Sequence, residues 1–181
     1  SKSIQMAEEK KKNLWKQFYA FFPEIELPIT LSEEYTGVFT KYNKPIPMDL
    51  IQSFILEQHL FLPEEEIDSD LEIEEYVPCF KLPKNKNYRA VVYWKASLLK
   101  YEYVIHTYDL KGKTITKHVI ASTTSDGKKI RQIVATIDPD LEIYIMGGDA
   151  DSDNFYDPEK SKAFSLEITP TGQIIHHFEE N

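Results

Sequence analysis

Closely spaced carboxylates toward the C-terminal end of the chain have the arrangement best suited to chemistry. Asp149, Asp151 and Asp153 occupy alternate positions, and Asp157 and Glu159 follow within the same short segment. When a loop curls, side chains at such positions turn their oxygens toward one point, and oxygen atoms are the ligands that Ca²⁺ prefers. The segment is therefore a candidate metal site, with calcium as the candidate ion.

The first half of this segment resembles the beginning of an EF-hand loop, which has the pattern D-x-D-x-D. The resemblance covers about a dozen residues. The sequence departs from the pattern at Asn154, which stands in place of the invariant glycine, and at Lys160, where the final glutamate belongs. The flanking sequence predicts strands rather than helices. In the alternative interpretation, the Asp and Asn side chains form turns by accepting hydrogen bonds from their own backbone.

A second group of carboxylates marks the sharpest change of composition in the chain, within residues 63–75. Complementary charge accelerates association and selects among partners, so this group is a candidate docking strip for a basic protein. The alternative is a solvated acidic connector between two parts of the fold. The candidate partner-binding residues are Glu64, Glu65, Glu66, Asp68, Asp70 and Glu72.

Histidines are the remaining candidates for metal or acid–base chemistry. His106 and His118 lie on the two arms of one predicted hairpin, and we expect them to be near each other across the strand pair. Two neighbouring imidazoles can bind a transition metal or transfer protons, although the spacing reveals no third ligand. His176 and His177 are adjacent in a predicted strand, so they must point to opposite faces.

No motif assigns a catalytic residue. The sequence lacks G-x-S-x-G, and Gly112-Lys113-Thr114 matches only the end of a phosphate-binding loop. Cys79 is the only cysteine, which excludes an intramolecular disulfide and favours a small buried side chain. We therefore interpret the chain as a binding protein rather than an enzyme. The rival class is a metal-dependent ligand binder or enzyme that uses the Asp149–Glu159 segment.

The overall charge limits the kind of partner. The 181 residues include 30 acidic and 21 basic side chains, which gives a net charge of −9 at pH 7. This balance disfavours nucleic acid, because the phosphate backbone would be repelled, and is compatible with a basic protein partner. No cofactor other than a calcium ion is implied.

The sequence also bears on location. No apolar stretch approaches the ~20 residues of a membrane span. The first residues are rich in lysine and glutamate and lack the apolar core of a signal peptide. We expect a cytoplasmic protein, with secretion as the alternative if an N-terminal segment was removed.

Apolar spacing predicts the elements that would position these residues. Helical spacing predicts one helix at 4–21 and another near residue 48, and a helix beginning at Ser32 should be brief because Gly37 follows. Beyond them, apolar and polar residues alternate, which places every second side chain on one face of a sheet. Strands are expected at 77–82, 88–97, 101–108, 114–122, 130–137, 142–146, 163–169 and 173–178.

The predicted fold class is α+β: N-terminal helices packed on an antiparallel β-meander of about seven to eight strands, either a curved sheet or a small partly closed barrel. By composition the chain divides into a helical N-terminal portion at 1–62, an acidic connector at 63–75 and an antiparallel β-sheet portion at 76–181. We expect these portions to form one compact domain.

Overall fold

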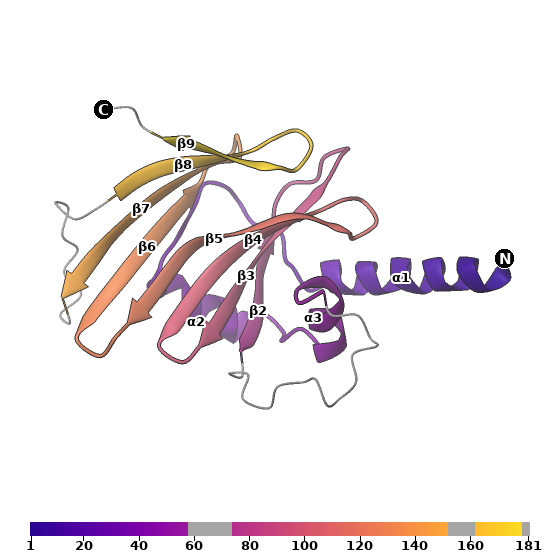
Figure 1. The fold of residues 1–181 in the computed structure, drawn as a ribbon, viewed down its shortest axis with the longest axis horizontal. Coiled ribbons are helices and arrows are strands. Elements are labelled where there is room, and N and C mark those ends of the chain that lie inside the picture. The colour runs from indigo at the N-terminus through magenta and orange to yellow at the C-terminus, as the bar shows by residue number, and fades with distance from the viewer. Residues whose placement is uncertain (58–73, 152–161, 179–181) are drawn as a thin grey trace.

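Helices pack on a curved antiparallel sheet that does not close into a barrel, which confirms the α+β prediction (Figure 1). The structure is a computed structural model that describes residues 1–57, 74–151 and 162–178. Within these residues the sheet has nine strands, of which β2 to β9 follow one another in chain order. The strands are β1 (Ile29–Leu31), β2 (Glu75–Lys81), β3 (Arg89–Ser97), β4 (Lys100–Tyr108), β5 (Thr114–Ser125), β6 (Lys129–Ile137), β7 (Glu142–Asp151), β8 (Lys162–Ile168) and β9 (Ile174–Phe178).

The sheet divides where β5 diverges from β6. These two strands pair only from Ser122↔Ile133 to Ser125↔Ile130, whereas β4 accompanies β5 along most of its length. Beyond that point β1 takes the place of β5 and pairs with β6 at Ile137. A strand from the N-terminal portion therefore fills the space that β5 leaves, and the sheet can curve around a common core.

The larger core lies on the concave side of this curved sheet. Alternate residues of β3 and β4, such as Val92 and Ile105, meet residues of the later strands, such as Ile143 and Leu166. All four side chains are almost completely buried. This is the packing that period-two alternation predicts for a sheet with one covered face.

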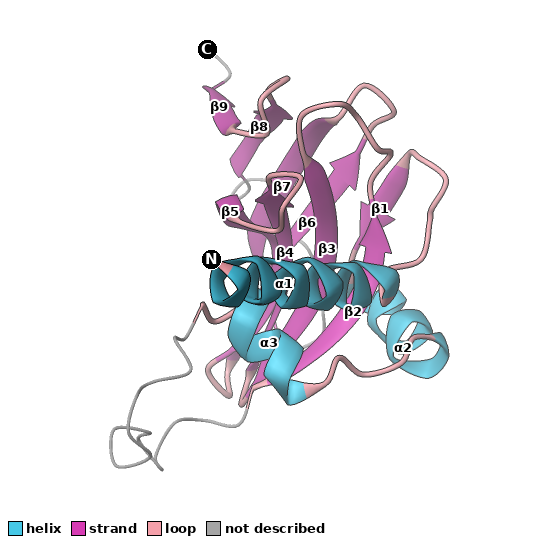
Figure 2. Cartoon of the chain, turned by 90° about the vertical axis from the view of Figure 1, so that its right-hand side faces the viewer, coloured by secondary structure: helices cyan, strands magenta, loops and turns pink. Residues whose placement is uncertain are grey.

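A smaller core forms where helices cover the other face of β2, β3 and β4. Helix α1 (Lys2–Ala20) crosses these strands with α3 (Met48–Phe54) beside it, as Figure 2 shows. Phe18 of α1 and Tyr108 of β4 are both fully buried in this cluster. The N-terminal half of α1 extends beyond the sheet and is exposed (Figure 1). Both faces of the first strands are therefore buried.

Helix α2 (Glu33–Tyr42) is longer than expected, so the prediction that Gly37 would keep it brief is wrong. A glycine inside a helix costs only about 1 kcal/mol relative to alanine. Tertiary packing outweighs that cost, because the buried Phe39 ring lies against the rings of Phe80 and Tyr103. Asn43 then ends the helix with its side-chain amide donating to backbone carbonyls of β2.

Gly112 in the turn between β4 and β5 lies directly against α1. Its φ is +90°, and a Cβ atom there would lie 2.8 Å from the Trp15 ring. Gly127 in the next hairpin has almost the same φ, +92°, but a Cβ atom there would meet nothing within 4 Å. Substitutions at these two glycines therefore separate the cost of backbone strain, which both share, from the cost of steric overlap, which only Gly112 has.

We predict that Gly112→Ala lowers the free energy of unfolding more than Gly127→Ala does. Both variants pay about 1–2 kcal/mol for a left-handed alanine, and the clash with Trp15 adds about 1–3 kcal/mol of overpacking in Gly112→Ala alone. Urea unfolding followed by tryptophan fluorescence measures the difference. Equal losses in the two variants would contradict the packing of this turn on α1.

Candidate binding pocket

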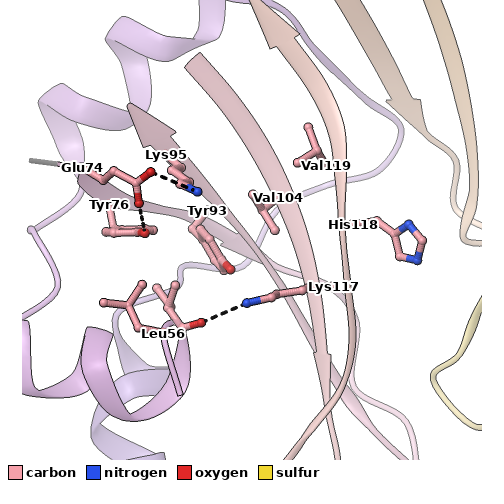
Figure 3. Close-up of a pocket in the computed structure, with 10 residues that line it drawn as sticks. Leu56, Glu74, Tyr76, Tyr93, Lys95, Val104, Lys117, His118 and Val119 are labelled. Atoms are coloured by element: carbon pink, nitrogen blue, oxygen red, sulfur yellow. Dashed lines mark hydrogen bonds and ion pairs between the residues drawn. The ribbon is translucent and has the colours of Figure 1, made fainter. Parts of the chain in front are cut away.

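A pocket of about 310 Å³ opens on the outer face of the sheet, between the C-terminal end of α3 and strands β3 to β5 (Figure 3). It lies beside the smaller core, against the strands that α1 and α3 partly cover. Its lining residues are Ile55, Leu56, Glu74, Tyr76, Tyr93, Lys95, Val104, Lys117, His118 and Val119.

Strand register explains the apolar floor of the pocket. Tyr93 of β3 pairs with Val104 of β4, and Val104 pairs with Val119 of β5, so the three side chains share one face of the sheet. Tyr93 and Val104 are buried, whereas Val119 is 49 % exposed because α3 does not reach β5. The exposed Leu56 borders the opposite wall. The result is an apolar surface that the helices leave partly uncovered.

Charged side chains line the rim. Glu74 accepts a hydrogen bond from the Tyr76 hydroxyl at 2.6 Å and forms an ion pair with Lys95 at 3.2 Å. Burial and the neighbouring Glu74 carboxylate raise the pKa of Tyr76, so its hydroxyl keeps its proton. Lys117 donates a hydrogen bond to the carbonyl of Ile55 at 3.2 Å, at the C-terminal end of α3. Glu74 therefore offsets the charge of Lys95, and Lys117 stabilises a helix end.

A buried hydrogen-bond chain supports the floor from below. His106 is fully buried, with Nδ1 3.1 Å from the Tyr93 hydroxyl and Nε2 2.8 Å from the Thr114 hydroxyl. Burial, and then the charge of Lys117, lowers the pKa of His106 to about 3. The ring is therefore neutral near pH 7 and a weak base. It also stacks on Tyr108 with ring centres 4.0 Å apart, so its contacts are those of a structural side chain.

The expected pairing of His106 with His118 is wrong. His106 stands opposite Lys117, and Ile105 stands opposite His118, so the two histidines point to opposite faces of the sheet. A shift of one residue in register reverses the face of a side chain, and this hairpin contains such a shift next to Tyr108. Figure 3 accordingly shows the His118 ring turned away from Lys117. By contrast, His176 and His177 do face opposite sides of the sheet, as expected. The ring of His176 contacts the ring of His118, whereas His177 contacts the carboxylate of Glu167.

Most aromatic residues in and next to β3 and β4 are buried, and so is Cys79. Tyr88, Trp94, Tyr103 and Tyr108 are buried, and only Tyr101 of this group is substantially exposed, at 40 %. Cys79 is completely buried, and burial raises the pKa of its thiol, as expected for a small apolar side chain. These strands therefore do not present a broad aromatic platform to solvent.

The predicted site residues lie largely outside the described residues. All six partner-binding candidates, Glu64, Glu65, Glu66, Asp68, Asp70 and Glu72, fall there, as do Asp153, Asp157 and Glu159 of the metal candidate. The backbone of Asp149 and Asp151 belongs to β7, which continues beyond its predicted end, and these residues stand opposite Arg131 and Lys129. Within the described part of the chain, no group of three or more His, Cys, Asp or Glu side chains is placed to hold a metal ion. The calcium site therefore stays a prediction.

Sequence reasoning missed the pocket residues Tyr93, Lys95 and Lys117. Their only signal is alternation along β3 and β5, which every half-buried strand shares. Among the described residues, none of the helices has both the length and the apolar composition of a membrane span. No protein-family model, curated protein or solved structure matches this chain.

Proposed function

We propose that the protein is a binding protein without catalytic activity, which recognises a basic protein segment carrying an apolar side chain. The basic residues of that segment would contact the carboxylates of residues 64–72, and its apolar side chain would enter the pocket beside α3. The segment that carries these carboxylates starts and ends beside the pocket, because Leu56 and Glu74 line the pocket and lie on either side of residues 58–73 in the chain.

The distribution of charge carries this proposal. The described residues contain 20 lysine and arginine side chains and 19 aspartate and glutamate side chains, so they are nearly neutral. The net charge of −9 therefore comes from the remaining residues, above all from 58–73, which contain six carboxylates and neither lysine nor arginine. Charge concentrated in one segment steers a complementary partner to that place.

The size and lining of the pocket support an apolar anchor. Its volume of about 310 Å³ is at the lower end for small-molecule sites and is sufficient for one large side chain of a partner. Tyr93, Val104 and Val119 form its apolar surface. An apolar or aromatic anchor in such a pocket commonly contributes most of the binding energy of an interface.

The titratable groups of the pocket favour binding over catalysis. Glu74 and Lys95 pair with each other, and Lys117 donates to a backbone carbonyl. Burial raises the pKa of Tyr93 and lowers that of His106, which moves both away from neutral pH. A general acid or base works best when its pKa lies near the working pH, and the shifts of Tyr93 and His106 carry both side chains away from that range.

A neutralised variant tests the proposal. We predict that changing Glu64, Glu65, Glu66, Asp68, Asp70 and Glu72 to Gln or Asn weakens binding of a fluorescent lysine–leucine peptide at least about tenfold, because each exposed ion pair contributes about 0.2–1 kcal/mol. Fluorescence anisotropy at low and moderate salt measures the affinity. The matched control neutralises six exposed carboxylates elsewhere: Glu8, Glu9, Glu24, Glu26, Glu34 and Asp49.

The control removes the same net charge, so it should bind the peptide nearly as well as the unchanged protein. Equal weakening of the two variants would show that only the overall charge matters. Undetectable binding of the peptide by the unchanged protein at low salt would overturn the proposal.

A further inference from the structure

Two histidine rings meet on the face of the sheet opposite the apolar floor of the pocket. His118 of β5 and His176 of β9 have ring centres 5.6 Å apart, with an angle of 62° between the ring planes. Their strands are not hydrogen-bonded neighbours in the described sheet, where β9 is the last strand of the meander (Figure 1). The side chains therefore bridge strands that backbone pairing leaves separate.

The registers place both histidines toward the concave side. His118 pairs with Ile105, and His176 pairs with Leu166, and both partners belong to the larger core. The ring of Phe164 stacks on that of His176, with ring centres 5.9 Å apart. His118 is partly buried and His176 is exposed, so the pair lies at the edge of the core where solvent ions have access.

We propose that His118 and His176 form a two-histidine site for a divalent transition-metal ion, which would join β9 to β5. Imidazole nitrogen is a good ligand for Cu²⁺, Ni²⁺ and Zn²⁺. Water would complete the coordination, because no third His, Cys, Asp or Glu accompanies the pair among the described residues. This site is independent of the proposed peptide-binding function.

The spacing of the rings fits this chemistry. A metal bonds imidazole nitrogen at about 2.0–2.1 Å, which puts it about 3 Å from each ring centre, so two ligands of one ion have ring centres about 5–6 Å apart.

His177 is a natural control. It is adjacent to His176 in the chain but lies on the opposite face, where its Nε2 is 2.9 Å from the carboxylate of Glu167. Loss of His177 removes one imidazole from the same strand and leaves the proposed pair intact. A metal held merely by neighbouring imidazoles of the His176-His177 dipeptide would depend on both residues.

Titration with Cu²⁺ at pH 7.5, followed by calorimetry, tests the site. We expect one strong site in the unchanged protein and in His177→Ala, and at least tenfold weaker binding in His118→Ala and His176→Ala. Circular dichroism checks that each variant is folded. Electron paramagnetic resonance of the unchanged protein with one equivalent of Cu²⁺ should show two coordinated imidazole nitrogens. This measurement needs no variant, so it does not depend on how a substitution affects folding.

Three results would overturn the proposal. The first is a dissociation constant for Cu²⁺ larger than about 100 µM in the unchanged protein, which would mean that binding is too weak for a specific site. The second is equal loss of affinity in His177→Ala and His176→Ala. The third is a resonance spectrum with one coordinated imidazole or none.

Discussion

Phe18→Ala is expected to lower the free energy of unfolding by about 3–5 kcal/mol, the usual cost of removing a fully buried phenylalanine. The side chain has no exposed surface, and its ring lies 5.0 Å from that of Phe54 and 5.8 Å from that of Tyr108. It therefore joins α1, α3 and β4 in the smaller core. Urea unfolding monitored by circular dichroism measures the loss.

The matched control is Met6→Ala on the same helix. Met6 is 70 % exposed, so truncation should change stability by less than about 0.5 kcal/mol, as is usual for surface substitutions. A loss of less than about 1 kcal/mol in Phe18→Ala would mean that α1 does not dock on β2–β4. The floor of the binding pocket would then lack its support.

Acidification should destabilise the protein through His106. Its folded-state pKa of about 3 lies below the ordinary value of 6.5, so the unfolded chain binds a proton first as pH falls. Stability from the neutral ring is complete above pH 6.5 and is lost progressively toward pH 3. Between pH 7 and pH 4 the loss from this group reaches about 3 kcal/mol, because each unit of pKa difference corresponds to about 1.4 kcal/mol.

His106→Gln removes the titration and keeps polar atoms beside Tyr93 and Thr114. We expect the variant to be less stable at pH 7, with a free energy of unfolding that falls less steeply between pH 6.5 and pH 4. The measurement is urea unfolding across that range for both proteins. Parallel pH profiles would show that His106 is not held neutral by burial.

Strand periodicity predicted most of the sheet because β2 to β8 each contain buried residues. The predicted ranges overlap β2 to β9, and the turn glycines Gly112, Gly127 and Gly172 all have the positive φ that hairpins need. Helix α3 also buries the face expected from its spacing, with Leu50, Ile51 and Phe54 inside. For these elements the spacing of apolar residues and the turn glycines favour the same structure that the tertiary packing stabilises.

The pocket and the histidine pair could not be predicted, because they depend on how distant segments meet. The pocket exists where α3 ends short of β5 and leaves Val119 exposed. The pairing of His118 with His176 depends on the curvature of the whole sheet and on the register shifts in β4 and β5. The three residues of β1 lie in a segment, 25–31, that the sequence indicates to be extended, but their pairing with β6 could not be predicted because it follows from the divergence of β5.

Methyl NMR of the isotopically labelled protein tests the central claim most directly, namely that a basic segment anchors in the pocket beside α3. On titration with the lysine–leucine peptide, we predict shift changes at the methyl groups of Ile55, Leu56, Val104 and Val119, which saturate together. Methyl groups of Ile143 in the larger core should not change. Shifts confined to other surfaces, or none at saturating peptide, would contradict the account.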